Sequence, residues 1–330
     1  MKINSTCICC NSNDFSIYDK YYHGRRLHIK NILICNFCKL KQADHFPDNQ
    51  ELKSFYNNIN TRQLFDPSKE TVYERYYKEF DSFLEFIIDK LKLNTMDQMN
   101  VIDIGAGNGR TLLQIKDLTN WNSTGIEPDK IKCEVLNFFK LNIINDTFEN
   151  ISNKLKNDHY DLIIISQVLE HIENPLILLK EINKKLKKNG HLWIDVPLCN
   201  NNYFNSRVND DVGHLFFFDE TTLGKILKQS NFHLASSGSY GGLIKSRTIF
   251  SSVKLFIKYN LHRFLPISLL NINKFISKKF NKYKDVNFKD ISKKNNIKIN
   301  ENSFEDCKLF MLAKKKKTKI NGNTDTLTPT

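Results

Sequence analysis

The sequence predicts a mostly parallel α/β sheet with helices on both faces, a small cysteine-rich module before it and a helical insertion near the C-terminal end. Through the middle of the chain, short apolar strands alternate with amphipathic helices. Near-continuous apolar strands are typical of parallel sheets buried on both faces. With 40% hydrophobic and 26% charged residues among 330, the composition excludes wholesale disorder and fibrous repeats.

The elements follow one another in a regular order. A helical segment is expected first, because Phe80, Phe83, Leu84, Ile87 and Leu91 recur at helical spacing. Seven strands are then expected at residues 101–104, 123–126, 142–144, 160–165, 191–196, 232–236 and 309–313. The helices between them are expected at residues 110–118, 130–141, 175–187 and 221–229. The third of these four helices is expected to end at Gly190, where the glycine would stop it.

These elements divide the chain into six stretches. In order they are a cysteine-rich module (1–45), a helical linker or lid (46–95), the core (96–240), a basic helical insertion (241–305), the last core strand (306–314) and a disordered tail (315–330). The N-terminal residues have no apolar leader, and no uninterrupted apolar stretch is long enough to cross a bilayer. These two features favour a cytoplasmic protein.

The net charge of +13 is concentrated in one segment. Residues 1–240 carry 29 basic and 30 acidic side chains, whereas residues 241–300 carry 14 basic and only two acidic ones. The helices expected in this basic segment would be amphipathic. Basic amphipathic helices can bind an acidic ligand or lie on anionic lipid at the inner face of a membrane. They can equally pack on the core with their lysines in water.

Three of the twelve glycines fall within five positions, after the first core strand. Gly105, Gly107 and Gly109 predict a tight turn that lets the backbone approach a ligand. Asp103, at the end of the strand, suits a ligand that carries an ammonium group. Glu127, at the end of the next strand, can accept hydrogen bonds from both hydroxyls of a ribose.

With these motifs, residues 96–240 and 305–314 resemble the class I S-adenosylmethionine-dependent methyltransferases, which have a Rossmann-like sheet. Ile126-Glu127-Pro128 resembles their second-strand motif, and the segments 160–175 and 187–197 resemble their fourth- and fifth-strand motifs. The resemblance implies S-adenosylmethionine as cofactor. The residues expected to bind it are Asp103, Gly105, Gly107, Gly109, Glu127, Asp146 and Gln167, with Asp146 near the adenine amine.

Two histidines are candidates for the catalytic base. His171 follows the fourth strand by a few residues, at the edge where open α/β sheets bind ligands. A histidine whose pKa lies near neutrality can take the proton of an acceptor hydroxyl, and Glu170 can orient its ring. The pair can also simply stabilise the following loop. His214 is the second candidate, on the loop that similar methyltransferases place over the acceptor.

The N-terminal module contains two Cys-x-x-Cys pairs, Cys7 with Cys10 and Cys35 with Cys38. Two such pairs supply a tetrahedral thiolate site for Zn²⁺, and a closed site of four cysteines is structural. Cys9 is left without a role. Similar pairs precede the core in bacterial methyltransferases that modify nucleotide-linked sugars and surface glycans.

The leading hypothesis is therefore O-methylation of a small or lipid-linked glycan precursor. An RNA methyltransferase with a zinc-ribbon recognition module is the first alternative. Nucleic acid is not the expected partner, because the fourth strand ends in Ser166-Gln167-Val168-Leu169 and lacks the Asn/Asp-Pro-Pro-aromatic run used on exocyclic base amines. A non-catalytic scaffold that binds a nucleoside is the second alternative.

Overall fold

The computed structural model describes residues 6–20, 31–46, 83–199, 213–241 and 306–315. The chain divides into two compact units, of which the smaller one spans residues 243–303. The basic insertion, the tail beyond residue 315 and most of the linker predicted at 46–95 lie outside the described residues.

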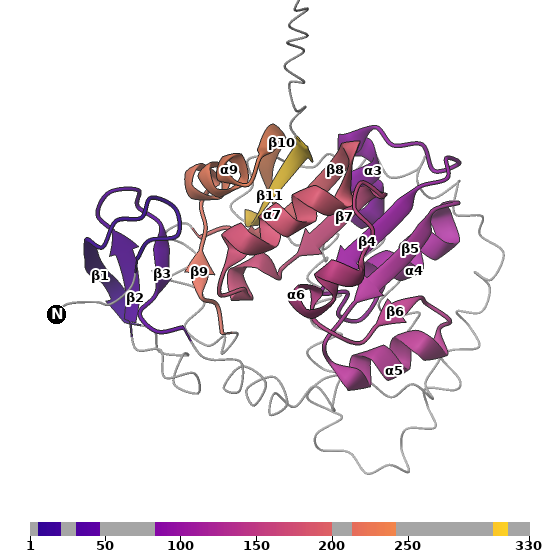
Figure 1. The fold of residues 1–330 in the computed structure, drawn as a ribbon, viewed down its shortest axis with the longest axis horizontal. Coiled ribbons are helices and arrows are strands. Elements are labelled where there is room, and N and C mark those ends of the chain that lie inside the picture. Colours follow the sequence, from indigo (N-terminus) through magenta and orange to yellow (C-terminus); the bar gives the residue numbers. More distant parts are fainter. Residues whose placement is uncertain (1–5, 21–30, 47–82, 200–212, 242–305, 316–330) are drawn as a thin grey trace, which may run out of the picture. The chain divides into compact units, whose positions relative to one another are not determined.

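The larger sheet has seven strands in the order β10-β11-β8-β7-β4-β5-β6. In chain order these are β4 (Asn100–Ile104), β5 (Asn122–Ile126), β6 (Ile143–Ile144), β7 (Tyr160–Ser166), β8 (Leu186–Pro197), β10 (Phe232–Gly241) and β11 (Asp306–Lys315). Strands β4 to β8 pair in parallel, and only β11 runs antiparallel to its neighbours β8 and β10. The predicted Rossmann-like, mostly parallel sheet is confirmed (Figure 1).

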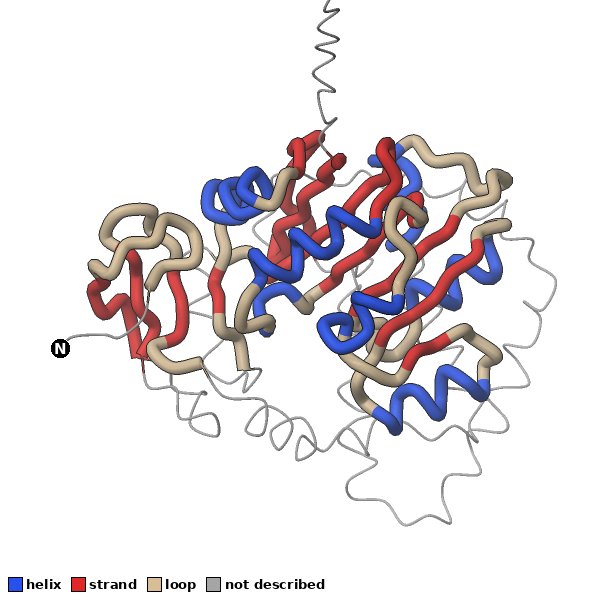
Figure 2. The backbone as a smooth tube through the Cα atoms, in the orientation of Figure 1, coloured by secondary structure: helices blue, strands red, loops and turns tan. Residues whose placement is uncertain are grey.

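Helices connect these strands (Figure 2). They are α3 (Phe83–Leu91), α4 (Arg110–Leu118), α5 (Lys130–Phe138), α6 (Phe148–Ile151), α7 (Pro175–Lys185) and α9 (Glu220–Gln229), with 3₁₀ turns η3 (Ser152–Lys154) and η4 (Leu169–His171). Helix α3 packs against α4, and α7 packs against α9. Residues 162–165 of β7 are fully buried, so both faces of the central strand are covered.

Side-chain caps mark the start of several helices, among them α5, α7 and α9. Asp129 accepts hydrogen bonds from the backbone N–H groups of the first turn of α5, and Asn174 does so for α7. Asp219 and Thr222 form a reciprocal capping box at α9. Each cap satisfies backbone donors that have no partner within the helix, and typically contributes about 1 kcal/mol.

A cluster of aromatic side chains attaches α3 to the sheet. The Trp193 indole of β8 stacks on Phe310 of β11 with ring centroids 5.2 Å apart. Phe83 and Phe86 of α3 meet Trp193 edge-on at 6.1 and 5.5 Å. This packing explains why the apolar stripe predicted for the first helix faces the core.

The boundary predicted between the third helix and the fifth strand is wrong. Helix α7 ends at Lys185, and strand β8 begins at Leu186, earlier than the expected start at residue 191. Gly190 lies inside β8 and does not end a helix. A Cβ atom there would lie only 2.8 Å from the carbonyl oxygen of Tyr160, so the glycine permits the close approach of β7 at an irregularity in the pairing.

Other predicted ends also differ from the structure. Helix α5 ends at Phe138 and not at the predicted residue 141, because Lys140 adopts a left-handed conformation with φ 55°. Strands β10 and β11 are longer than expected, since each extends along the other from Phe232–Lys315 to Gly241–Asp306. Pairing between distant segments therefore decides the length of these two strands.

A second, four-stranded sheet carries the cysteine-rich module. Its order is β1-β2-β3-β9, with β1 at Phe15–Lys20, β2 at Asn31–Cys35, β3 at Lys41–Ala43 and β9 at Phe216–Phe217. The fourth strand comes from the segment just before α9, on the far side of the core sequence from β3. The sequence did not predict this pairing, because β9 is too short to leave a hydrophobic pattern.

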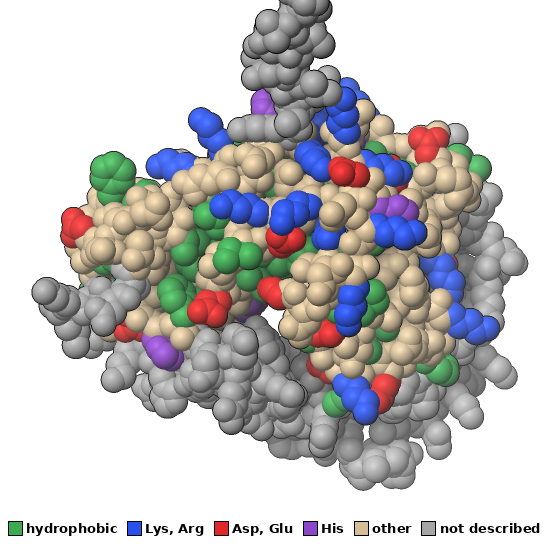
Figure 3. Space-filling view, in the orientation of Figure 1, with side chains coloured by type: hydrophobic (Ala, Val, Ile, Leu, Met, Phe, Trp, Pro, Cys, Tyr) green, Lys and Arg blue, Asp and Glu red, His purple; other side chains and the backbone are tan. Residues whose placement is uncertain are grey.

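The charge of the described residues is mixed. Lys and Arg side chains lie among Asp and Glu side chains on the face shown in Figure 3, in agreement with the near-zero charge of residues 1–240. None of the described helices has the length and apolarity that a membrane span requires.

Candidate functional site

The glycine-rich turn joins β4 to α4 with three left-handed residues. Gly105, Gly107 and Gly109 have φ values of 71°, 56° and 74°. A Cβ atom on Gly105 would lie 2.3 Å from Val168 Cγ2, and one on Gly109 would lie 2.2 Å from Leu136 Cδ2. At Gly107 the nearest atom would be a carbonyl oxygen 3.8 Å away. Gly105 and Gly109 thus allow close packing, whereas a Cβ atom at Gly107 would meet no close neighbour.

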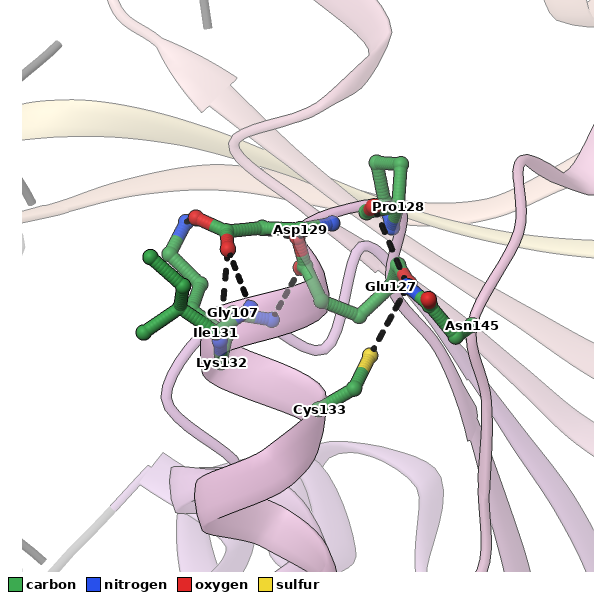
Figure 4. Close-up of polar contacts among 8 residues, drawn as sticks. All are labelled: Gly107, Glu127, Pro128, Asp129, Ile131, Lys132, Cys133 and Asn145. Atoms are coloured by element: carbon green, nitrogen blue, oxygen red, sulfur yellow. Dashed lines mark hydrogen bonds and ion pairs between the residues drawn. The ribbon is translucent and has the colours of Figure 1, made fainter. Parts of the chain in front are cut away.

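Glu127 connects the end of β5 to this turn (Figure 4). Its Oε2 accepts a hydrogen bond from the N–H of Gly107 at 2.8 Å, and its Oε1 accepts one from the N–H of Asp129 at 3.0 Å. The side chain is buried. Because each carboxylate oxygen can accept a second hydrogen bond, this oriented group remains suited to two ribose hydroxyls.

Asp103 lies at the carboxyl end of β4 and is buried. Burial raises its pKa to about 7, which the neighbouring charges of Asp195 and Glu127 reinforce and Arg110 opposes. A cationic ligand beside this carboxyl would stabilise its ionised form. The predicted contact of Asp103 with an ammonium group stays a prediction.

Two further predicted cofactor residues have partners within the protein. Asp146 Oδ1 accepts hydrogen bonds at 2.8 Å from both the N–H of Thr147 and the amide of Asn150. These bonds lower the pKa of Asp146 and place its carboxylate at the start of α6. Gln167 has φ 56° and donates its amide to Asp195 Oδ1 at 2.9 Å. Their contact with a cofactor stays a prediction.

The three predicted catalytic residues lie together. Glu170 and His171 belong to η4, directly after β7, and His214 precedes β9. The Nε2 atoms of both histidines lie 3.9 Å from Glu170 Oε1, and the two rings have centroids 4.7 Å apart. Glu170 is 1% exposed and His214 is 4% exposed. The structure thus joins two candidates that come from opposite sides of α7 and β8 in the sequence.

The electrostatic state of His171 follows from its position. Burial lowers the pKa of His171 to about 4, and a hydrogen bond with the Gly213 carbonyl opposes this shift. The imidazole is therefore neutral at physiological pH, which leaves one ring nitrogen with a lone pair. The near-neutral pKa expected of a catalytic base from the sequence is not found at His171.

The four predicted zinc ligands form a compact cluster. The Sγ atoms of Cys7 and Cys38 lie 3.4 Å apart, and those of Cys10 and Cys35 lie 3.5 Å apart. All four sulfur atoms lie within 4.8 Å of one another. Thiolates bound tetrahedrally to Zn²⁺ at ~2.3 Å lie roughly 3.8 Å apart, so the cluster fits this ion. Cys9 is buried beside the cluster but is not a member of it.

Two groups at this edge of the sheet were not predicted from the sequence. Asp195 is fully buried in β8, where it accepts hydrogen bonds from Gln167 and, at 3.1 Å, from the Trp193 indole. Leu215 accepts a hydrogen bond from the N–H of Ala43 and donates one to the carbonyl of Glu170, both at 2.8 Å. A lone aspartate within an apolar strand was the only signal for the first, and no local pattern indicated the second.

Comparison with known proteins identifies the family of this chain. The sequence profile of the methyltransferase domain family matches residues 72–237, half of the chain. The chain therefore belongs to the methyltransferase domain family.

Similarity to individual proteins is more limited. The chain is 29% identical over 116 residues to the ubiquinone biosynthesis O-methyltransferase of Rickettsia typhi, a stretch covering 32% of this chain and 45% of that protein. It is 31% identical over 126 residues to the tRNA U34 carboxymethyltransferase of Campylobacter fetus, covering 36% and 43%. The matched stretches thus span less than half of these relatives.

Among solved structures, a SAM-dependent methyltransferase from Archaeoglobus fulgidus aligns with 74% of this chain and 99% of its own, at 18% identity and a TM-score of 0.46. A Haloferax volcanii methyltransferase in complex with the Trm112 activator aligns with 77% of this chain and 96% of its own, at 12% identity and a TM-score of 0.49.

We expect Glu127 to contribute strongly to cofactor affinity. Glu127→Ala removes the acceptor of two ribose hydroxyls and should weaken S-adenosylhomocysteine binding by about 1.5–3 kcal/mol, or roughly ten- to hundredfold. Glu127→Gln keeps one oxygen for the Gly107 N–H and isolates the contribution of the charge. Calorimetry measures both, with exposed Glu134→Ala on α5 as the matched control. Unchanged affinity in both Glu127 variants would contradict this role.

Asp103 should make cofactor affinity depend on pH. Since its free-state pKa lies near 7 and a bound ammonium group favours the ionised form, affinity should rise as pH increases through 7. Below that value, affinity should fall by up to about tenfold per pH unit. Calorimetry at a series of pH values on both sides of a pKa of about 7 measures the effect. Asp103→Asn should flatten the profile, and an equally steep profile in that variant would exclude Asp103 as its source.

Proposed function

We propose that this methyltransferase transfers a methyl group to a hydroxyl oxygen of a sugar or glycan precursor. The observation that carries the proposal is the cluster of Glu170, His171 and His214 at the carboxyl end of β7. Val168, in the same segment, contacts the glycine-rich turn, so the cluster adjoins the expected cofactor site.

A hydroxyl acceptor needs a group that removes its proton, and the cluster can supply one. S-adenosylmethionine supplies a methyl group on a positively charged sulfur, which leaves as a neutral thioether. The acceptor hydroxyl must lose its proton as its oxygen bonds to the methyl carbon. An imidazole of the cluster, 3.9 Å from the Glu170 carboxylate, can take that proton, because the carboxylate stabilises the imidazolium that forms. Orientation of the acceptor against the methyl group supplies much of the remaining rate enhancement.

The class of acceptor is inferred from charge and from the cysteine-rich module. Residues 241–300 carry twelve more basic than acidic side chains, which supports a phosphorylated or lipid-linked acceptor. Such an acceptor would place the protein in the cytoplasm and at the inner face of an anionic membrane. The paired cysteines resemble those of sugar-modifying methyltransferases.

Methylation of RNA is the second candidate. The similarity to a tRNA U34 carboxymethyltransferase favours it, as does the basic segment. Binding through that segment would then be strongly salt-dependent.

The reaction can be tested with methyl-labelled S-adenosylmethionine. We expect the full-length protein to label a nucleotide-linked or polyprenyl-phosphate-linked sugar, and fragmentation should locate the label as a methyl ether. Total tRNA, incubated in parallel, should remain unlabelled. His171→Asn and His214→Asn should lower kcat by roughly 10²- to 10⁴-fold. Exposed His233→Asn is the matched control. Label on tRNA alone, or on nitrogen or carbon of the sugar, would overturn the proposal.

We also propose that Cys7, Cys10, Cys35 and Cys38 bind one structural Zn²⁺. The support is their mutual spacing and the absence of an open coordination position in a four-thiolate site. Cys35→Ser combined with Cys38→Ser should remove one equivalent of zinc and unfold the module. Metal analysis of protein purified without added zinc measures this loss. Cys133→Ser, a buried thiol of α5, should retain the metal, and a double variant that keeps its zinc would refute the assignment.

A further inference from the structure

The catalytic cluster has the composition of a metal site. It brings two imidazoles and one carboxylate together from two segments of the chain. One ligand atom from each of Glu170, His171 and His214 lies within 4.8 Å of the other two. This set is independent of the four cysteines, which belong to the smaller sheet.

The distances within the cluster fit an ion better than direct hydrogen bonds. Both Nε2 atoms lie 3.9 Å from the same oxygen, Glu170 Oε1. A direct N–H···O hydrogen bond would require about 2.7–3.2 Å. Two ligand atoms that share an ion at ~2.0–2.2 Å lie roughly 3–4 Å apart. Glu170 Oε1 is therefore equidistant from two nitrogens at a spacing that a bridging cation satisfies.

The tautomer of His171 gives its Nε2 the lone pair that a ligand needs. Its Nδ1 lies 3.3 Å from the carbonyl oxygen of Gly213. Because a carbonyl can only accept, this contact assigns the proton to Nδ1 and the lone pair to Nε2, the nitrogen nearer to Glu170 Oε1. Metal-binding histidines commonly donate their other ring nitrogen to such a backbone carbonyl.

The backbone holds the two segments in this arrangement. The N–H of Leu215, next to His214, donates to the carbonyl of Glu170 at 2.8 Å. Glu170 and His214 are almost completely buried, whereas His171 remains partly exposed. The ligands are thus positioned before binding, with access from the side of His171.

We propose that Glu170, His171 and His214 bind a divalent cation of the Zn²⁺, Mn²⁺ or Fe²⁺ type, with coordination positions open to the acceptor hydroxyl. Two imidazoles and a carboxylate suit these ions, and three protein ligands are typical of catalytic sites. The cation would lower the pKa of the acceptor hydroxyl. With the cation bound, the two imidazoles are ligands and no longer serve as the base, so the hydroxyl proton passes to solvent before its oxygen bonds to the methyl carbon. This role rests on the proposed O-methylation, but binding of the cation does not.

Binding can be measured on the full-length protein without any acceptor. Protein prepared with Co²⁺ in place of Zn²⁺ should give two spectra, an intense sulfur-to-metal band from the four cysteines and a weak ligand-field band without sulfur character. Glu170→Gln and His214→Gln should remove only the weak band and weaken Mn²⁺ binding, followed by electron paramagnetic resonance, at least about tenfold. Exposed His233→Gln should leave both readouts unchanged.

Two controls keep the test decisive. Calorimetric affinity for S-adenosylhomocysteine should be preserved in each variant, which reports that the core is folded. His171→Gln provides a third ligand variant if one of the others does not fold. No Mn²⁺ binding by the wild type, or equal Mn²⁺ affinity in the folded variants, would overturn the metal site. A cation that binds as expected without stimulating methyl transfer would instead count against its proposed role on a hydroxyl.

Discussion

The close approach of Gly105 to Val168 is the constraint on which the functional edge of the sheet depends. Strands β4 and β7 are parallel neighbours, so their carboxyl ends meet at one edge. The segment after β7 can reach the glycine-rich turn only because position 105 has no Cβ, which would otherwise lie 2.3 Å from Val168. That contact places η4 beside the turn. The expected cofactor site and the Glu170 cluster consequently share one edge.

The cysteine-rich module also contacts this edge through the backbone. Its strand β3 pairs with β9, and Leu215 forms hydrogen bonds to Ala43 on one side and Glu170 on the other. A second link runs from the amide of Gln229, at the end of α9, to the carbonyl of Cys9 at 2.7 Å. Through these backbone contacts the module supports the segment that carries His214.

Electrostatics at the edge favour a cationic ligand. Asp103 and Glu127 end adjacent parallel strands, and Asp195 is buried nearby in β8. Burial and their mutual repulsion raise the pKa of Asp103, so a bound positive charge relieves an unfavourable arrangement. A cofactor that carries both a sulfonium and an ammonium group meets this requirement. Hydrogen bonds from the N–H groups of Gly107 and Asp129 fix the orientation of the Glu127 carboxylate without any ligand.

The sequence by itself determined the features that depend on short stretches of chain. The apolar strands, the glycine turn, Glu127 at the end of β5 and the cysteine pairs all follow from local spacing and local backbone requirements. Only the tertiary structure decided which distant segments meet. The short strand β9 pairs with β3, Gly190 lies within β8, and His171 meets His214 from the other side of β8 in the chain. Hydrophobic periodicity records which face of an element is buried, but carries no information about which partner buries it.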